Sequence, residues 1–503
     1  MPPRTVVRRS VITQKMATKV AQSANPRAAV PSLLKLNQVL KKRQNLVVPH
    51  SELQSCIEHK RFISSTYSVG DYGQIEELPD FDNVQPEEYN NLFRKYLLQC
   101  KVKCNFNSQL QDVKNIQMKT NFLNVIIKQV SSPDFIKIVD KETLTEFFQM
   151  LKSNIIRYTP PIPDLARVPM IGDDITDTII EASWPHLELV YKAFQSFLEN
   201  PKMDPKSFVD NITQSFVHRL ISLFNTPDIR ERTVLKLLVH RLYLRFNVHR
   251  PLIRTEMQNA LYTFLFEDKF FCGVNEILEI FMSIINGYSV PLKQEHLRFF
   301  HSILLPLHGS DFYHSFADNL AICIGQYVQK DASLMVDFFK GLLTFWPKSS
   351  TVKEVMFIEQ LDHILEVISD DQFDAIRMQL FDKIGDLVQS NAFRVSEAAM
   401  ILWRNDRFVE LSIKYSNEIL PIITPRLYAT GMQHWNSAIK NLAVSVIRIC
   451  MDSVSPEESA QFNQKVKENE EASANQLQMK KQTWLAIEQQ AFTNNPEMRP
   501  QQA

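Results

Sequence analysis

The sequence is poor in glycine. Only 10 of its 503 residues are glycine, whereas glycine usually makes up roughly 7% of a chain. Hairpin turns and phosphate-binding loops need glycine because a side chain disfavours the backbone conformations and close approaches that they use. The shortage therefore argues against a sheet-rich fold and against a nucleotide-binding enzyme.

Cysteines and long apolar runs are also scarce. Six scattered cysteines do not form a disulfide framework. Cys100 and Cys104 could offer two metal ligands, but no second Cys/His pair follows nearby, so buried thiols are the simpler interpretation. No stretch reaches the roughly 18–20 apolar residues of a membrane span, and the N-terminus has no apolar signal segment. We expect an intracellular protein without a membrane span, metal or cofactor.

Acidic residues are missing from the first 51 positions, which carry ten lysines and arginines. Because Lys+Arg and Asp+Glu both total 56, the rest of the chain carries a matching acidic excess, and net charge gives no argument for a nucleic-acid partner. We expect residues 1–84 to be a basic, mostly disordered arm. Lys41, Lys42 and Arg43 could form a nuclear-import signal or belong to a solvated tail, so we expect a cytoplasmic protein that can also be nuclear.

Catalytic signatures are missing as well. The sequence contains no G-x-G-x-x-G, G-x-x-x-x-G-K-[ST], G-x-S-x-G or H-E-x-x-H motif. Two carboxylate pairs, at 173–174 and 370–371, stand next to expected turns, where helix entry and solvation account for them. The sequence therefore predicts a protein that is not an enzyme and has no catalytic residues.

Helical periodicity dominates residues 85–455. One example is the apolar stripe formed by Phe208, Ile212, Phe216, Leu220 and Leu223. Helix pairs open at intervals of about 36–46 residues, as expected for HEAT or armadillo repeats. These openings lie near residues 184–185, 227–228, 273, 309–310, 349–350, 390–391 and 433–434. We predict an all-α, HEAT/armadillo-like helical-repeat superhelix (an α-solenoid) over residues 85–455, followed by a polar Gln/Glu/Lys-rich tail at 456–503. Four prolines predict a surface insertion at 159–178.

The segment at residues 228–254 is unusually basic. It carries seven lysines and arginines and two histidines against two acids. His240 and Arg241 lie off its expected buried stripe, and Tyr243 lies on the border of that stripe. The next helix pair carries Ile280 and Ile284.

Corresponding helices of neighbouring repeats lie side by side in a solenoid. Tyr243, Ile280 and Ile284 would then form an apolar slot, and basic residues would ring it: His240, Arg241, Arg250, Lys293 and His296. Such a slot suits a short peptide with aliphatic anchors and a carboxylate or phosphate. A solvated basic face over ordinary core residues is the alternative.

The residues of this slot belong to a series of collinear blocks, among them Trp184-Pro185-His186, His240-Arg241-Leu242-Tyr243 and His434-Trp435-Asn436. From about Leu78 to Ser455 the sequence resembles the B-prime regulatory subunit family of protein phosphatase 2A. The resemblance implies a non-catalytic regulatory and substrate-targeting subunit of a trimeric Ser/Thr protein phosphatase. Members of this family bridge the scaffold and catalytic subunits and bind Leu-x-x-Ile-x-Glu motifs of substrate or adaptor proteins in a concave groove.

The resemblance also implies roles for individual residues. His240 and Arg241 would bind the glutamate of the motif. The aliphatic pocket would be lined by Tyr243, Ile280 and Ile284, with Glu279 beside it. Arg250, Lys293 and His296 would favour acidic or phosphorylated flanks. A charged turn would face the scaffold subunit; it comprises Asp228, Arg230, Glu231 and Arg232.

The sequence departs from the family pattern at a few positions. Leu237 stands where a threonine is usual on the groove helix, and Phe281 and Met282 replace smaller residues before Ser283. The alternative function is a HEAT-type protein-interaction adaptor that is not associated with a phosphatase.

Overall fold

The computed structural model describes residues 74–157 and 180–452, apart from 82–84, 86, 107–111 and 367, together with 471, 475, 478–491, 493 and 494. Except for residues 74–81, the expected N-terminal arm lies outside the described residues, and so does the expected insertion at 159–178. Within the expected polar tail, residues 478–491 are helical and exposed.

Every regular element among the described residues is a helix, and none is a strand. This confirms the all-α helical-repeat fold. The chain divides into two compact units, whose described parts are residues 74–331 (the N-terminal unit) and 332–494 (the C-terminal unit). Within the described residues, no helix combines the length and the apolar character needed to cross a membrane.

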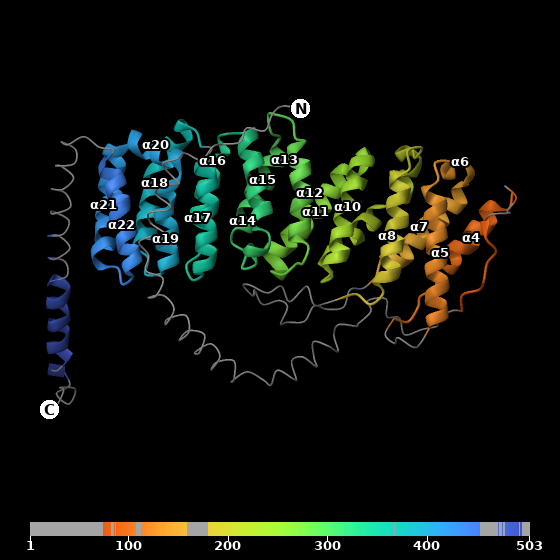
Figure 1. The fold of residues 1–503 in the computed structure, drawn as a ribbon, viewed down its shortest axis with the longest axis horizontal. Coiled ribbons are helices and arrows are strands. Elements are labelled where there is room, and N and C mark those ends of the chain that lie inside the picture. Colours follow the sequence, from red (N-terminus) through yellow and green to blue (C-terminus); the bar gives the residue numbers. More distant parts are fainter. Residues whose placement is uncertain are drawn as a thin grey trace. The chain divides into compact units, whose positions relative to one another are not determined.

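Two layers of helices make up the N-terminal unit (Figure 1). Neighbours in the first layer pack against each other: α5 (Val113–Ser131), α8 (Trp184–Glu199), α10 (Ile229–Arg245), α12 (Val274–Asn286) and α15 (Ala317–Lys330). The second layer contains α4 (Tyr89–Gln99), α7 (Lys141–Ile155), α9 (Gln214–Ser222), α11 (Arg250–Thr263) and α13 (Gln294–Phe299). The short helices α6 (Phe135–Ile138) and α14 (Leu305–Leu307) complete the unit.

The C-terminal unit repeats this construction. One layer consists of α17 (Thr351–Leu365), α19 (Phe393–Ile401) and α22 (Ser437–Asp452). The other consists of α16 (Leu334–Thr344), α18 (Asp370–Val388) and α21 (Ser416–Gln433), with the short α20 (Asp406–Lys414) between α19 and α21 in the chain. Each pair alone would leave an apolar face exposed, and stacking of pairs buries it.

The repeat length is visible in both helix starts and polar contacts. From α8 onward, first-layer helices begin at residues 184, 229, 274 and 317 in one unit and at 351, 393 and 437 in the other. Six of these starts lie within three residues of a predicted opening, and the start at 317 lies seven residues after one. Hydrogen bonds between α10 and α12 and between α12 and α15 join residues 43 to 45 positions apart, as in His240 with Ser283 and Cys323 with Leu278. A side chain on one helix therefore meets its counterpart one repeat later.

Side-chain caps fix several helix starts. The Asp228 carboxylate accepts a hydrogen bond from the backbone N–H of Arg230 at the start of α10. Asp140 and Ser350 cap α7 and α17 in the same way, and Ser369 forms a capping box with Gln372 at α18. Each cap satisfies a backbone donor that the first turn of a helix leaves unpaired.

The residue before α12, Gly273, lies close to Phe224. Gly273 immediately precedes α12 at an ordinary φ of −94°, and a Cβ there would lie 2.5 Å from Cβ and 2.7 Å from the carbonyl oxygen of Phe224. We expect Gly273→Ala to lower the free energy of unfolding by about 1–3 kcal/mol, because the backbone must shift to admit the methyl group. Urea denaturation measures this loss.

Gly325 in α15 provides the matched control, because nothing lies within 4 Å of a Cβ built there. Gly325→Ala should leave the free energy of unfolding unchanged or raise it by up to about 1 kcal/mol. Equal losses in the two alanine variants would contradict the packing argument.

A buried histidine makes the stability of the N-terminal unit depend on pH. His186 in α8 is 4% exposed, its Nε2 lies 3.0 Å from the Ile116 carbonyl oxygen, and burial lowers its pKa to about 4. An unfolded histidine has a pKa of about 6.5, so between these values the unfolded chain binds more protons. The contribution of neutral His186 to stability is therefore fully present above pH ~6.5. As the pH falls from there to ~4, the free energy of unfolding should fall by up to about 1.4 kcal/mol for each pH unit.

The measurement is urea denaturation at pH 7.5 and pH 5.5 in the wild type and in His186→Gln. We expect a smaller difference between the two pH values in the variant, because glutamine can still donate to Ile116 but does not titrate. An unchanged difference would assign the pH dependence to other groups.

Candidate functional site

Three polar contacts set the register between α10 and α12, the two helices that carry most of the predicted site. Arg232 Nε lies 2.9 Å from Glu276 Oε1, Lys236 forms an ion pair with Glu279, and His240 Nε2 lies 2.9 Å from Ser283 Oγ. They follow one another at successive turns along the two helices. The structure thus brings the predicted residues of α10 next to those of α12.

The aliphatic residues of the predicted slot lie deep. Ile280 is 2% exposed and Ile284 is 4% exposed, whereas Tyr243 is half-buried. Phe281 is fully buried and stacks on Phe299, with ring centroids 4.4 Å apart. A ligand would therefore contact only the edges of the two isoleucines in this conformation.

Leucines are exposed on α10 itself. Leu237 and Leu244 are 45% and 53% exposed, and they lie one turn before and about one turn after Arg241. Leu237, which departs from the family pattern, therefore adds apolar surface beside Arg241. Met282 on α12 is half-buried.

Two arginines hold Tyr243. Arg250 Nε donates to the backbone carbonyl of Tyr243 (2.9 Å), Arg250 Nη2 donates to that of Leu244 (3.2 Å), and the guanidinium lies 5.2 Å from the centroid of the Tyr243 ring. Arg254 Nη1 donates to the Tyr243 hydroxyl at 3.2 Å. Arg250 was expected at the edge of the groove; the structure places it at the C-terminal end of α10, where it binds the last carbonyls and positions Tyr243.

His296 lies inside the protein rather than at the groove edge. It is 7% exposed and its ring lies parallel to that of Tyr288, with centroids 3.6 Å apart. Burial lowers its pKa, so the ring is neutral at pH 7. In this conformation the loop residue Tyr288 covers the imidazole, and the expected contact with acidic flanks stays a prediction. Lys293, at the start of α13, is exposed as expected.

Three cations at or beside the site have carboxylate partners within the chain. Arg241 pairs with Glu199 at the end of α8, Lys236 pairs with Glu279, and Arg254 lies 3.7 Å from Glu295. Burial also lowers the pKa of His240, which favours its neutral form. An acidic ligand at Arg241 would therefore bind by exchanging an ion pair.

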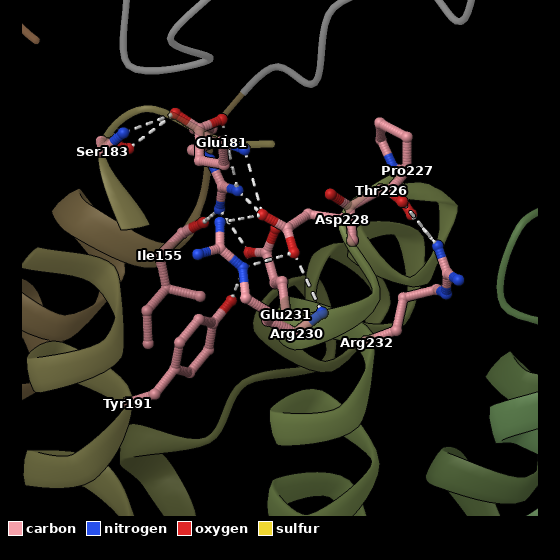
Figure 2. A network of polar contacts seen from close by, with 11 residues as sticks. Ile155, Glu181, Ser183, Tyr191, Thr226, Pro227, Asp228, Arg230, Glu231 and Arg232 are labelled. Carbon is pink, nitrogen blue, oxygen red and sulfur yellow. Dashed lines mark hydrogen bonds and ion pairs between the residues drawn. The ribbon is translucent and has the colours of Figure 1, made fainter. Parts of the chain in front are cut away.

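The predicted scaffold-facing turn contains a buried ionic network (Figure 2). Arg157 Nη1 and Nη2 donate to the two oxygens of Glu231 at 2.7 and 2.6 Å, and the Tyr191 hydroxyl donates to Glu231 at 2.8 Å. The Asp228 carboxylate accepts from the backbone N–H of Glu181 at 3.0 Å. Glu231 is 0% exposed and Asp228 is 3% exposed.

Arg232 is also buried. It binds Glu276 and the carbonyls of Thr226 and Pro227. Asp228, Glu231 and Arg232 thus have their charges compensated inside the chain, and the scaffold-facing role of the turn stays a prediction. Arg230 keeps a 42% exposed side chain and is the member of the turn that can reach a partner.

Sequence reasoning missed Glu199, Ser283, Arg254 and Tyr288 as members of the site. For two of them a signal existed: Ser283 follows His240 by 43 positions and Glu199 precedes Arg241 by 42, which is one repeat in either direction. Arg254 and Tyr288 carry no such signal, because they reach Tyr243 and His296 from another helix and from a loop.

The arrangement is suited to binding rather than to catalysis. It offers ion pairs that a charged ligand could exchange and two exposed leucines on α10. It also offers a tyrosine of α10 that two arginines of α11 hold in place. In the part of the chain that the structure describes, no three His, Cys, Asp or Glu side chains are grouped so that they could hold a metal ion.

Known proteins resemble this chain over most of its length. Residues 78–491 match the family described as protein phosphatase 2A regulatory B subunit (B56 family). The chain is 36% identical over 421 residues to the B' eta isoform of the 59 kDa regulatory subunit of Ser/Thr protein phosphatase 2A from Arabidopsis thaliana, covering 84% of this chain and 82% of that protein.

Two further relatives come from a mammal and a yeast. The alpha isoform of the 56 kDa regulatory subunit from Mus musculus is 36% identical over 76% of this chain and 78% of its own length. The delta 2 isoform of the 56 kDa regulatory subunit from Schizosaccharomyces pombe is 34% identical over 92% of this chain and 72% of its own length.

Proposed function

The chain belongs to the B56 family of protein phosphatase 2A regulatory B subunits, and from this premise we propose that it targets a trimeric Ser/Thr phosphatase to its substrates. In this role it bridges the scaffold and catalytic subunits, and it has no catalytic residues of its own. Holding a substrate near the catalytic subunit raises the effective concentration of that substrate. Co-purification of the tagged full chain with both other subunits tests this role, and their absence would contradict it.

We further propose that the face of α10 and α12 binds Leu-x-x-Ile-x-Glu motifs. The observation that supports this proposal is the α10–α12 register: His240, which precedes Arg241, contacts Ser283 beside Ile284, and Lys236 pairs with Glu279 beside Ile280. The two basic residues suit the glutamate of the motif, and the exposed leucines of α10 suit its aliphatic residues. Affinity for one short peptide should be modest, because an extended peptide loses conformational entropy on binding.

The test is a calorimetric titration of a Leu-x-x-Ile-x-Glu peptide into the purified full chain. A peptide in which alanine replaces the glutamate is the control. Saturable binding of the first peptide and not of the second supports the proposal. Binding of neither peptide by a helical sample would withdraw the motif and leave the family assignment standing.

Lys293 should contribute long-range attraction rather than a specific contact, because its side chain is exposed at the start of α13. We expect Lys293→Ala to weaken binding of a motif peptide with acidic flanks by about two- to five-fold, the range of an exposed ion pair. The dependence of affinity on salt should become shallower. Titrations at two salt concentrations measure both effects.

Lys340→Ala, which removes an exposed lysine from α16 in the C-terminal unit, is the control and should leave both quantities unchanged. An equal change in the two lysine variants would indicate a bulk charge effect.

A further inference from the structure

Arg241, the residue proposed to bind the glutamate of the motif, already holds a carboxylate. Its Nη1 forms an ion pair with Oε1 of Glu199, the last residue of α8. The side chains of Arg241 and Glu199 are 36% and 54% exposed, respectively. The pair is therefore open to solvent and to any ligand that reaches Arg241.

Glu199 is poorly placed for the stability of its own helix. The C-terminal end of a helix carries a partial negative charge, so a carboxylate there is unfavourable and a basic residue is preferred. The last turn of α8 contains no basic residue. Arg241, from the neighbouring helix α10, is the cation that pairs with the Glu199 carboxylate.

Other contacts already join α8 to its surroundings at this point. Arg245 Nη2 donates to the carbonyl of Asn200 at 3.3 Å, and the Asn200 side chain donates to the carbonyls of Val130 and Ser132. Removing the charge of Glu199 therefore leaves the end of α8 attached to α10 and to the segment after α5. The Glu199–Arg241 pair is not required to hold the two helices together.

We propose that Glu199 is an internal competitor for the proposed motif site: it occupies Arg241 in the free protein and is displaced by the carboxylate of an incoming motif. The inference rests on the proposed function of that site. Exposed ion pairs are weak, so Glu199 adjusts the affinity of the site rather than closing it. A motif with a neutral residue at the glutamate position does not displace Glu199, because it offers Arg241 no replacement for the lost charge.

Glu199→Gln tests this mechanism, because glutamine keeps the shape of the side chain and removes its charge. Glu188→Gln is the matched control: it removes the same charge from α8, and Glu188 pairs with Lys192 of its own helix at 2.7 Å. Leu-x-x-Ile-x-Glu and Leu-x-x-Ile-x-Ala peptides are titrated into each full-length protein by calorimetry at low and high salt.

We expect Glu199→Gln to bind the glutamate peptide about two- to five-fold more tightly than the wild type at low salt. The alanine peptide should remain without detectable binding to either protein, and Glu188→Gln should match the wild type with both peptides. The gain should shrink toward zero at about 0.5 M salt, where the Debye length is only a few ångströms.

The possible failures are distinguishable. If the wild type and Glu199→Gln bind the glutamate peptide equally at low salt, the internal competition is refuted and the motif site stands. If Glu199→Gln and Glu188→Gln gain affinity equally, the effect is one of total charge and the inference is also refuted. If neither the wild type nor Glu199→Gln binds, although both remain helical by circular dichroism, the motif site and the inference fall together.

Discussion

Replacing Arg241 by glutamate is expected to weaken binding of a Leu-x-x-Ile-x-Glu peptide by at least about 100-fold, because placing like charges face to face at an interface costs several kcal/mol. The variant would set the new carboxylate against both Glu199 and the glutamate of the motif. Calorimetry measures the loss, and circular dichroism should report an unchanged helical content, because Arg241 lies on the exposed side of α10.

Arg219→Glu is the matched control for this charge reversal. Arg219 is an exposed arginine on α9, in the second layer of the same unit, and its reversal changes the net charge equally. We expect it to keep motif affinity within a few-fold of the wild type. Unchanged affinity in Arg241→Glu, with helicity intact, would refute the assignment of the groove. His240→Ala should also abolish detectable binding while preserving the fold, because it removes the second basic contact.

The second large effect concerns stability. Replacing Arg157 by alanine is expected to lower the free energy of unfolding of the N-terminal unit by about 3–5 kcal/mol, the usual cost of removing one partner of a buried ion pair. Arg157 is 3% exposed and donates two hydrogen bonds to Glu231, which is fully buried. Without the guanidinium, the Glu231 carboxylate keeps the Tyr191 hydroxyl but loses its compensating charge.

Urea denaturation of the full chain measures this loss, and Arg230→Ala is the control. Arg230 also pairs with a carboxylate, that of Asp228, but its side chain is 42% exposed. We expect Arg230→Ala to cost less than Arg157→Ala, about 1–2 kcal/mol, because solvent reaches the Arg230 end of the pair and the buried Asp228 carboxylate keeps the backbone N–H donors of Glu181 and of residue 230. Equal losses in the two variants would show that burial does not determine the contribution of these pairs.

The network around Glu231 shows how burial reverses the interpretation of a charged segment. In the sequence, the residues from Asp228 to Arg232 have the composition of a solvated, partner-facing turn. In the structure, residues distant in the chain are the partners of this segment. Arg157 compensates the charge of Glu231, and Glu276 compensates that of Arg232. The Tyr191 hydroxyl and the backbone N–H of Glu181 donate hydrogen bonds to Glu231 and Asp228 (Figure 2). Nothing in the local sequence signals these partners, because they come from other repeats.

His296 and Arg250 illustrate the same limit on a smaller scale. Both are basic residues at sequence positions that suit the rim of a groove. Tyr288 covers His296, and Arg250 turns back to bind the final carbonyls of α10. In both cases the residue contacts a side chain or backbone carbonyls of a neighbouring segment, at a position where the sequence predicts contact with a ligand.

The sequence by itself determined the helical class and, to within eight residues, the starts of the first-layer helices from α8 onward. It also indicated α10 and α12 as the helices of the proposed site. These features depend on local periodicity, on turn residues such as Gly273 and on the spacing of repeats, all of which are properties of neighbouring residues. The family blocks are likewise a property of the linear chain.

Only the tertiary structure decided which charges face a ligand and which face each other. The pairing of Arg241 with Glu199 depends on the register between α8 and α10, and the burial of Glu231 depends on the approach of Arg157. Register and burial arise when helices pack, because a shift of one turn would exchange the partners of every side chain at the contact. A linear sequence specifies that packing only through the fold as a whole.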